Sequence, residues 1–210
     1  MRIRTWRNLT IPVAAAICFS LVGHGRAGEP LEMTRSAVEK VLVVLKDPKL
    51  KSPEKKQERI ERLKEIINPI FDYDEMARRA LGAHWRRRTP AEQEEYLALF
   101  RVFIEGVYAD RVDLYEGERI VVGRETIDGD YAEVESKVVN ARGEESPVIF
   151  RLRRADAKWR VYDAVVENIS VVQNYRSQFD RVISKSSYDE LRKLLKDKSG
   201  QSELIPPKRS

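Results

Sequence analysis

Beyond its first 27 residues, this sequence has almost none of the side chains on which most enzymes depend. The 210 residues include one cysteine, Cys18, and two histidines, of which only His84 lies outside that first segment. The sequence holds no glycine-rich phosphate loop, serine nucleophile elbow or zinc-ligand spacing. A lone histidine is most often a packed or exposed side chain without a catalytic role. The sequence therefore gives little support for catalysis by a cysteine nucleophile, a serine triad or a zinc ion.

The sequence also lacks an apolar run long enough to span a membrane. Its longest run covers residues 9–22, whereas a transmembrane helix needs roughly 20 residues. Three arginines precede this run, and a Gly-Arg-Ala sequence at 25–27 places small side chains where signal peptidase reads them. Ile17 precedes Cys18, where a lipoprotein would carry a small residue, so lipidation is not expected. The pattern predicts a secretory signal peptide over residues 1–27, which is removed.

The chain has almost no excess of positive charge once residues 1–27 are removed. Residues 1–27 hold four of the 39 basic residues and none of the 34 acidic ones, so 35 basic and 34 acidic residues remain. A nearly neutral chain gives no electrostatic reason to expect nucleic-acid binding, because that affinity comes from clustered lysine and arginine. The exported part also lacks cysteine, and a domain of this size needs no disulfide bond. We expect a protein of the bacterial periplasm.

Hydrophobic periodicity divides the exported chain into a helical and a strand-rich part. Apolar residues at helical spacing, with proline and capping signals, predict helices over residues 31–45, 52–68, 74–81 and 89–115. Alternation then predicts four strands over residues 118–127, 131–140, 146–154 and 158–167. Capping boxes at Ser170 and Ser187 start two more helices. The prediction is one α+β domain over residues 28–197, with a four-stranded antiparallel sheet wrapped on one face by helices, and a flexible tail over 198–210.

The longest predicted helix has an unusually wide apolar face. Its apolar side chains cover roughly half of the helix circumference, more than the stripe of about 100° that most helices bury. The helix is either packed between the sheet and other helices, or part of its face lines an internal apolar cavity. Periodicity leaves both interpretations open and favours the first.

One carboxylate keeps an enzymatic alternative open. Asp163 lies on the last predicted strand, and an aspartate in an apolar pocket can act as a base. A small carboxylate-dependent enzyme on a helix-wrapped sheet would use it in this way. The competing and favoured interpretation is a structural carboxylate that accepts hydrogen bonds from nearby backbone or arginine.

Two separated motifs resemble one known family. The sequence FDYDEMA at residues 71–77 is followed by LGAHW at 81–85 and Thr-Pro at 89–90, and WRVYD at 159–163 is followed by ISVVQNYRSQF at 169–179. In order and spacing they resemble the periplasmic lipid carriers of the MlaC, or toluene-tolerance, family. One departure is Asn168, where the family usually has glycine. Asparagine tolerates the left-handed conformation better than most residues, so we expect the turn to be kept.

The resemblance implies a carrier without a cofactor and without enzymatic activity. Such a carrier shuttles phospholipid between an outer-membrane lipoprotein complex and an inner-membrane ABC transporter complex with a lipid-transfer domain subunit, and so maintains outer-membrane lipid asymmetry. Acyl chains would enter a cavity between helices and sheet, with the headgroup left near solvent. The wide apolar face of the longest helix and the alternating strand positions place this cavity between that helix and the inner face of the sheet. A carrier for another lipid, such as a hopanoid, fits the sequence equally well.

Three criteria select the residues expected to bind lipid: this resemblance, a place on the apolar face of the longest helix, and an alternating strand position. They are Trp85, Leu99, Phe100, Phe103, Val107, Tyr108, Val134, Val138, Phe150, Leu152 and Tyr175. A run of three arginines at 86–88 is a possible docking patch for anionic headgroups or an acidic partner. No residue is predicted to bind a metal.

Overall fold

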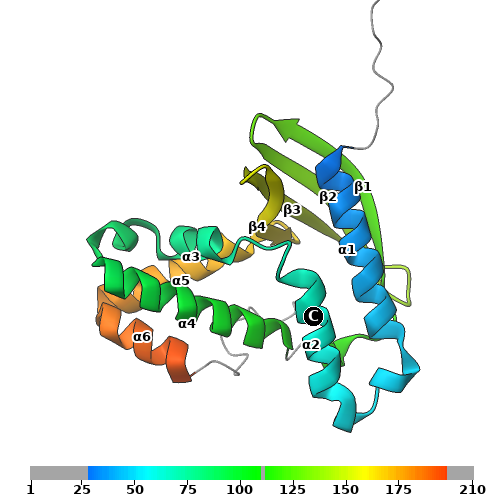
Figure 1. Cartoon of the computed structure of the whole chain (residues 1–210), viewed down its shortest axis with the longest axis horizontal. Coiled ribbons are helices and arrows are strands. Elements are labelled where there is room, and N and C mark those ends of the chain that lie inside the picture. Colours follow the sequence, from blue (N-terminus) through cyan, green and yellow to red (C-terminus); the bar gives the residue numbers. More distant parts are fainter. Residues whose placement is uncertain (1–27, 110–111, 198–210) are drawn as a thin grey trace, which may run out of the picture.

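The computed structural model describes residues 28–109 and 112–197 (Figure 1). The predicted signal peptide and the predicted tail lie outside the described residues. The α-helices are α1 (Glu29–Lys46), α2 (Lys56–Ile67), α3 (Tyr73–Leu81), α4 (Pro90–Ala109), α5 (Val171–Lys185) and α6 (Tyr188–Asp197). The 3₁₀ helices are η1 (Pro48–Leu50), η2 (Pro53–Lys55), η3 (Gly82–Arg87) and η4 (Val112–Leu114). All six predicted helices are present, within a few residues at most ends.

The strands form one antiparallel sheet in the order β1-β2-β3-β4-β5. They are β1 (Arg119–Asp128), β2 (Tyr131–Val139), β3 (Glu145–Ala155), β4 (Lys158–Val166) and β5 (Ile169–Ser170). The predicted meander is confirmed, but the count of four strands was wrong. The fifth strand has two residues, too few to produce an alternating pattern in the sequence. Glu167 and Asn168 form the turn before it with φ of 50° and 65°, so Asn168 adopts the left-handed conformation expected of it.

Helices cover one face of the sheet at one end and gather into a bundle at the other (Figure 1). Helix α1 packs along β1 and β2, and α2 packs on α1. Helices α3, α4, α5 and α6 pack on one another, and α3 and α5 reach β4. The apolar face of α4 is therefore buried mainly by α3, α5 and α6 rather than by the sheet, since Phe103 packs on Tyr175 and Phe179 of α5. Its width follows from core packing on several sides, as the favoured interpretation held, but the packing partners are helices and not the sheet.

The core falls into two clusters that match this division. The bundle encloses aromatic side chains, among them Phe100, Phe103, Tyr175 and Phe179. Under α1, the sheet buries a smaller cluster that includes Val134, Leu152 and Trp159. Each cluster removes apolar surface from water, which supplies the main stabilisation of the fold.

A short segment before α3 joins the bundle to the sheet. Phe71 forms a parallel bridge with Val161 on β4, and the backbone N–H of Asp72 donates to the Val161 carbonyl over 2.8 Å. The Asp72 side chain caps α3 by accepting from the N–H of Glu75 at 3.0 Å, and it also accepts from Arg153 on β3 at 2.7 Å. One buried carboxylate thus fixes the start of α3 against the sheet.

The longest helix ends earlier than the sequence predicted. Helix α4 stops at Ala109, whereas periodicity extended it to residue 115, and the described chain resumes as η4. The tighter η4 turn delivers Val112 and Leu114 to the wall of an apolar pocket. Val112 and Leu114 continued the helical pattern in the sequence, but they are apolar because they line this pocket.

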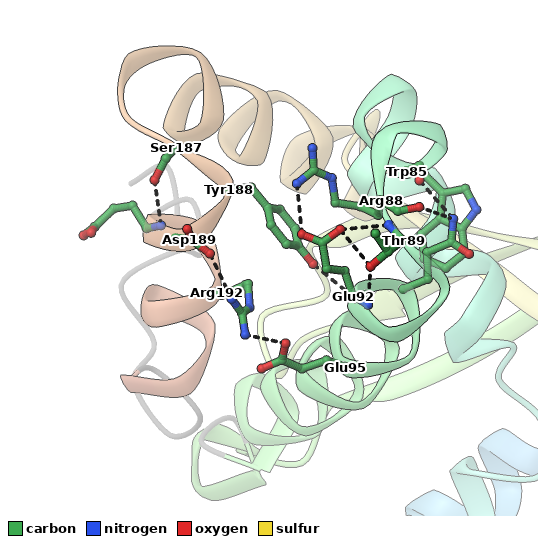
Figure 2. A network of polar contacts seen from close by, with 11 residues as sticks. Trp85, Arg88, Thr89, Glu92, Glu95, Ser187, Tyr188, Asp189 and Arg192 are labelled. Carbon is green, nitrogen blue, oxygen red and sulfur yellow. Dashed lines mark hydrogen bonds and ion pairs between the residues drawn. The ribbon is translucent and has the colours of Figure 1, made fainter.

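Helix α6 is held against the start of α4 by a polar network (Figure 2). Tyr188 Oη donates to the carbonyl of Glu92 at 3.2 Å, and the Arg88 guanidinium lies 4.4 Å from the centre of the Tyr188 ring. Arg192 bridges Asp189 at 2.9 Å and Glu95 at 2.5 Å. These contacts add directional bonds to the apolar contact of α6 with the bundle.

The tyrosine of this network predicts a loss of stability in alkali. Burial raises the pKa of Tyr188 to about 12, whereas an unfolded tyrosine titrates near pH 10. Its contribution is therefore complete below about pH 10 and is lost as the pH rises towards 12. We expect the urea midpoint to fall over this interval, and to fall less steeply in Tyr188→Phe. Equal slopes for the two proteins would contradict the prediction.

Candidate functional site

An apolar pocket lies where α1, α2, the end of α4 and the first two strands meet. Its volume is about 520 Å³, within the roughly 300–1,000 Å³ typical of small-molecule sites. Its wall consists of Val41, Leu42, Leu45, Ile60, Leu63, Lys64, Ile67, Asn68, Tyr73, Glu105, Tyr108, Ala109, Val112, Leu114, Tyr115, Glu118, Ile120 and Val138. Most of these side chains are aliphatic or aromatic. The pocket therefore suits a hydrocarbon ligand better than a polar one.

The polar side chains of the wall are largely paired with one another. Lys64 lies 3.6 Å from Glu105 and 3.2 Å from Glu61. Tyr73 Oη donates to Asn68 Oδ1 at 3.0 Å, and burial raises the pKa of Tyr73, which keeps its hydroxyl neutral. Paired groups do not demand hydrogen bonds from a ligand. An apolar chain can lie beside them without leaving a buried polar atom unsatisfied.

A second, polar pocket of about 400 Å³ adjoins the apolar one. The two share Leu45, Val112 and Tyr115 in their walls. The rest of the second wall consists of Lys51, Pro53, Lys56, Arg59 and Asp113. A ligand with an apolar body and a charged end could therefore occupy both pockets together.

The structure does not bring the eleven predicted lipid-binding residues together. Tyr108 and Val138 line the apolar pocket. Six others belong to the bundle core or pack against it: Trp85, Leu99, Phe100, Phe103, Val107 and Tyr175. Val134, Phe150 and Leu152 pack in the cluster of the sheet. The pocket thus lies beside the end of α4, not between the length of that helix and the sheet.

Seven of the 18 wall residues lie on α1 and α2, where periodicity predicted helices but no cavity. Their apolar stripes were visible, with Val41, Leu45, Ile60, Leu63 and Ile67 at helical spacing. Nothing in a periodic stripe tells whether it closes on a neighbouring helix or borders an open space. That information lies in the packing of the elements.

The two candidate catalytic side chains have structural partners. Asp163 is 3% exposed and accepts from the Ser170 hydroxyl at 2.6 Å and from the N–H of Val172 at 3.0 Å. It thereby fixes the first turn of α5 to β4. His84 Nε2 lies 2.9 Å from Asp180 Oδ1 on α5. Neither residue lines the apolar pocket.

This role of Asp163 predicts a change of stability without a change of lipid binding. Asp163→Asn keeps the shape but removes the charge and one acceptor, so we expect a loss of about 1.5–3 kcal/mol in the free energy of unfolding. Urea denaturation measures it, and Asp180→Asn, at an exposed pair worth less than about 1 kcal/mol, is the control. A folded Asp163→Asn protein that had lost a ligand would instead favour a functional carboxylate.

Within residues 28–109 and 112–197, no three histidine, cysteine or acidic side chains are grouped so that they could hold a metal ion. Within the same ranges no helix combines the length and apolar character needed to cross a membrane.

The fold and the pocket define an α+β protein with an apolar pocket between its helices and the edge of its sheet. The MlaC protein family model matches residues 35–197. The chain therefore belongs to the MlaC family, and the resemblance of the two sequence motifs is confirmed.

Individual relatives agree with this assignment. Toluene tolerance protein ttg2D of Pseudomonas putida is 24% identical over 129 residues, which cover 60% of each chain. The intermembrane phospholipid transport system binding protein MlaC of Haemophilus influenzae is 21% identical over 129 residues, 59% of this chain and 60% of that protein. The matched region thus spans about 60% of the length of these curated relatives.

A solved structure has the same fold. The phospholipid-binding protein from Ralstonia solanacearum, determined in complex with a phospholipid, superposes with a TM-score of 0.70 and 24% identity. The superposition covers 84% of this chain and 99% of the other. The names of these three relatives describe lipid binding, lipid transport or toluene tolerance, and none of them describes an enzyme.

Proposed function

We propose that the protein is a periplasmic carrier that holds a phospholipid by its acyl chains. The apolar pocket between α1, α2 and the end of α4 is the observation that carries this proposal. Membership of the MlaC family and the phospholipid in the Ralstonia relative support the same ligand class. Neither a cofactor nor a metal is needed, because the protein only has to shelter its cargo from water.

The physical basis of carriage is the burial of methylene groups. Each one removed from water contributes about 0.8 kcal/mol, so a bound acyl chain leaves for water only slowly. Efficient release then requires an apolar destination. We infer that the carrier exchanges lipid with an outer-membrane lipoprotein complex and with an inner-membrane ABC transporter complex that has a lipid-transfer domain subunit, which maintains outer-membrane lipid asymmetry.

Mass spectrometry of organic extracts tests the proposal. The full chain is expressed in a bacterial host, purified from the periplasm without detergent and extracted. We expect close to one phospholipid per protein molecule. We also expect the intact mass of the protein to be that of a chain whose first residue is Gly28. A polycyclic lipid would point to a hopanoid carrier. Lipid-free protein from the same preparation would contradict carriage itself.

A further inference from the structure

The polar pocket beside the apolar one has an unusual arrangement of charge. Lys51, Lys56 and Arg59 line it together with one carboxylate, Asp113. Asp113 lies 2.5 Å from Lys56 and also pairs with Arg59, whereas Lys51 has no ion-pair partner in the described part of the chain. Three positive charges thus face one negative charge. The pocket is suited to an additional anion.

Arg59 adds a second observation at this pocket, although Arg88, Arg160 and Arg192 share the same kind of unpaired Nε outside it. The residue is only 8% exposed, and its Nε is buried without a hydrogen-bond partner among the described residues. A buried donor without an acceptor is unfavourable, and buried polar groups in folded proteins are nearly always paired. A guanidinium group binds the oxygens of a phosphate through its planar set of donors. An anion with several oxygens would compensate this side chain better than Asp113 alone.

The position of these cations relative to the apolar pocket limits the identity of the anion. The two pockets share Leu45, Val112 and Tyr115, so a molecule that extends from the apolar pocket past these residues enters the pocket that Arg59 lines. The predicted arginine patch is placed differently. Arg88 is engaged by Tyr188 and Glu92, and none of the residues 86–88 lines either pocket.

We propose that the pocket formed by Lys51, Lys56 and Arg59 binds the phosphate of the lipid whose acyl chains occupy the apolar pocket. The proposal rests on the proposed function and assigns the headgroup to a defined place. It implies that the carrier selects for a phosphate group in addition to acyl chains. A lipid with the same chains but no phosphate would lose the contacts with these cations.

A competition between two lipids tests this selectivity. Delipidated protein is incubated with vesicles that contain equal amounts of dioleoyl phosphatidylglycerol and dioleoylglycerol, and native mass spectrometry gives the ratio of the two bound lipids. We expect Lys56→Gln together with Arg59→Gln to lower the ratio of phospholipid to diacylglycerol about tenfold relative to wild type. Total bound lipid should stay unchanged. Because each protein meets the same vesicles, differences in lipid extraction cancel.

Further variants protect the test against unfolding and general charge effects. If loss of Arg59 prevents folding, the exposed Lys51 and the half-buried Lys56 carry the test as single Gln variants, each with an expected decrease of about threefold. Lys193→Gln on α6 removes the same charge from an exposed position outside both pockets and should leave the ratio unchanged. A decrease in this control equal to that in Lys56→Gln would overturn the proposal.

The remaining outcomes separate the subsite from the function and from free phosphate. Lipid uptake with the same ratio in wild type and variants would refute the headgroup site but leave the carrier function intact. No uptake of either lipid by wild type would refute the carrier function. If inorganic phosphate alone stabilises delipidated wild type but not the variants, and the lipid ratio is unaffected by the substitutions, the pocket is a free-anion site and the proposal is wrong.

Discussion

Val41→Asp is expected to abolish lipid carriage while the protein stays folded. Val41 lies on α1 and lines the apolar pocket, so the new carboxylate would face the space that the acyl chains must fill. An unpaired charge in contact with hydrocarbon is opposed by a desolvation free energy of several kcal/mol. Bound lipid should fall by about a hundredfold or more. Lipid extraction and thermal melting are measured on the same preparation.

A neighbouring residue on the same helix supplies the control. Val43 is 71% exposed and does not line the pocket, so Val43→Asp adds the same charge to α1 without entering the pocket. It should bind lipid as wild type does. The empty pocket can admit water around Asp at position 41, so we expect similar melting temperatures for both variants. Normal lipid content in Val41→Asp would place the lipid elsewhere.

The order and type of the larger elements were accessible from the sequence because each has local signals. Ser170 was predicted to cap a helix, and its hydroxyl accepts from the N–H of Gln173 at 3.0 Å. Thr89 and Glu92 form the reciprocal bonds of a capping box. These signals depend on residues three positions apart, so a single sequence contains them. The same holds for strand alternation, which placed β1 to β4 within about two residues.

The location of the pocket was not accessible, because it depends on contacts between distant segments. Glu125 on β1 accepts from the N–H of Leu31 at 2.9 Å, which ties the start of α1 to the sheet. Glu125 lies at a β-bulge, where the register of β1 and β2 shifts between Val122 and Glu125. No local pattern announces such a contact. It sets where α1 crosses the sheet, and therefore leaves Val41 beside open space while the apolar face of α4 is closed by other helices.

Phe103→Ala tests this division from the other side. Phe103 is fully buried, and its ring centre lies 5.3 Å from that of Tyr175 and 6.3 Å from that of Phe179. Truncation leaves a cavity inside the bundle, and such changes cost about 3–5 kcal/mol. For a domain of this size the melting temperature should fall by roughly 10 °C. The lipid bound per folded molecule should remain that of wild type, because Phe103 does not line the apolar pocket.

The pair Val41→Asp and Phe103→Ala therefore gives opposite results if the pocket beside α1 and α2 holds the lipid. Val102→Ala is the matched control for the second variant, since Val102 is 53% exposed and adjacent on α4, and a change of less than about 0.5 kcal/mol is expected there. A cavity along α4 predicts the reverse pattern, in which Phe103→Ala changes lipid binding at little loss of stability. Melting temperature and lipid content measured together on the three proteins decide between the two locations. Substitution of a packed core residue changes the free energy of unfolding, whereas substitution of a residue on the pocket wall changes the free energy of lipid binding.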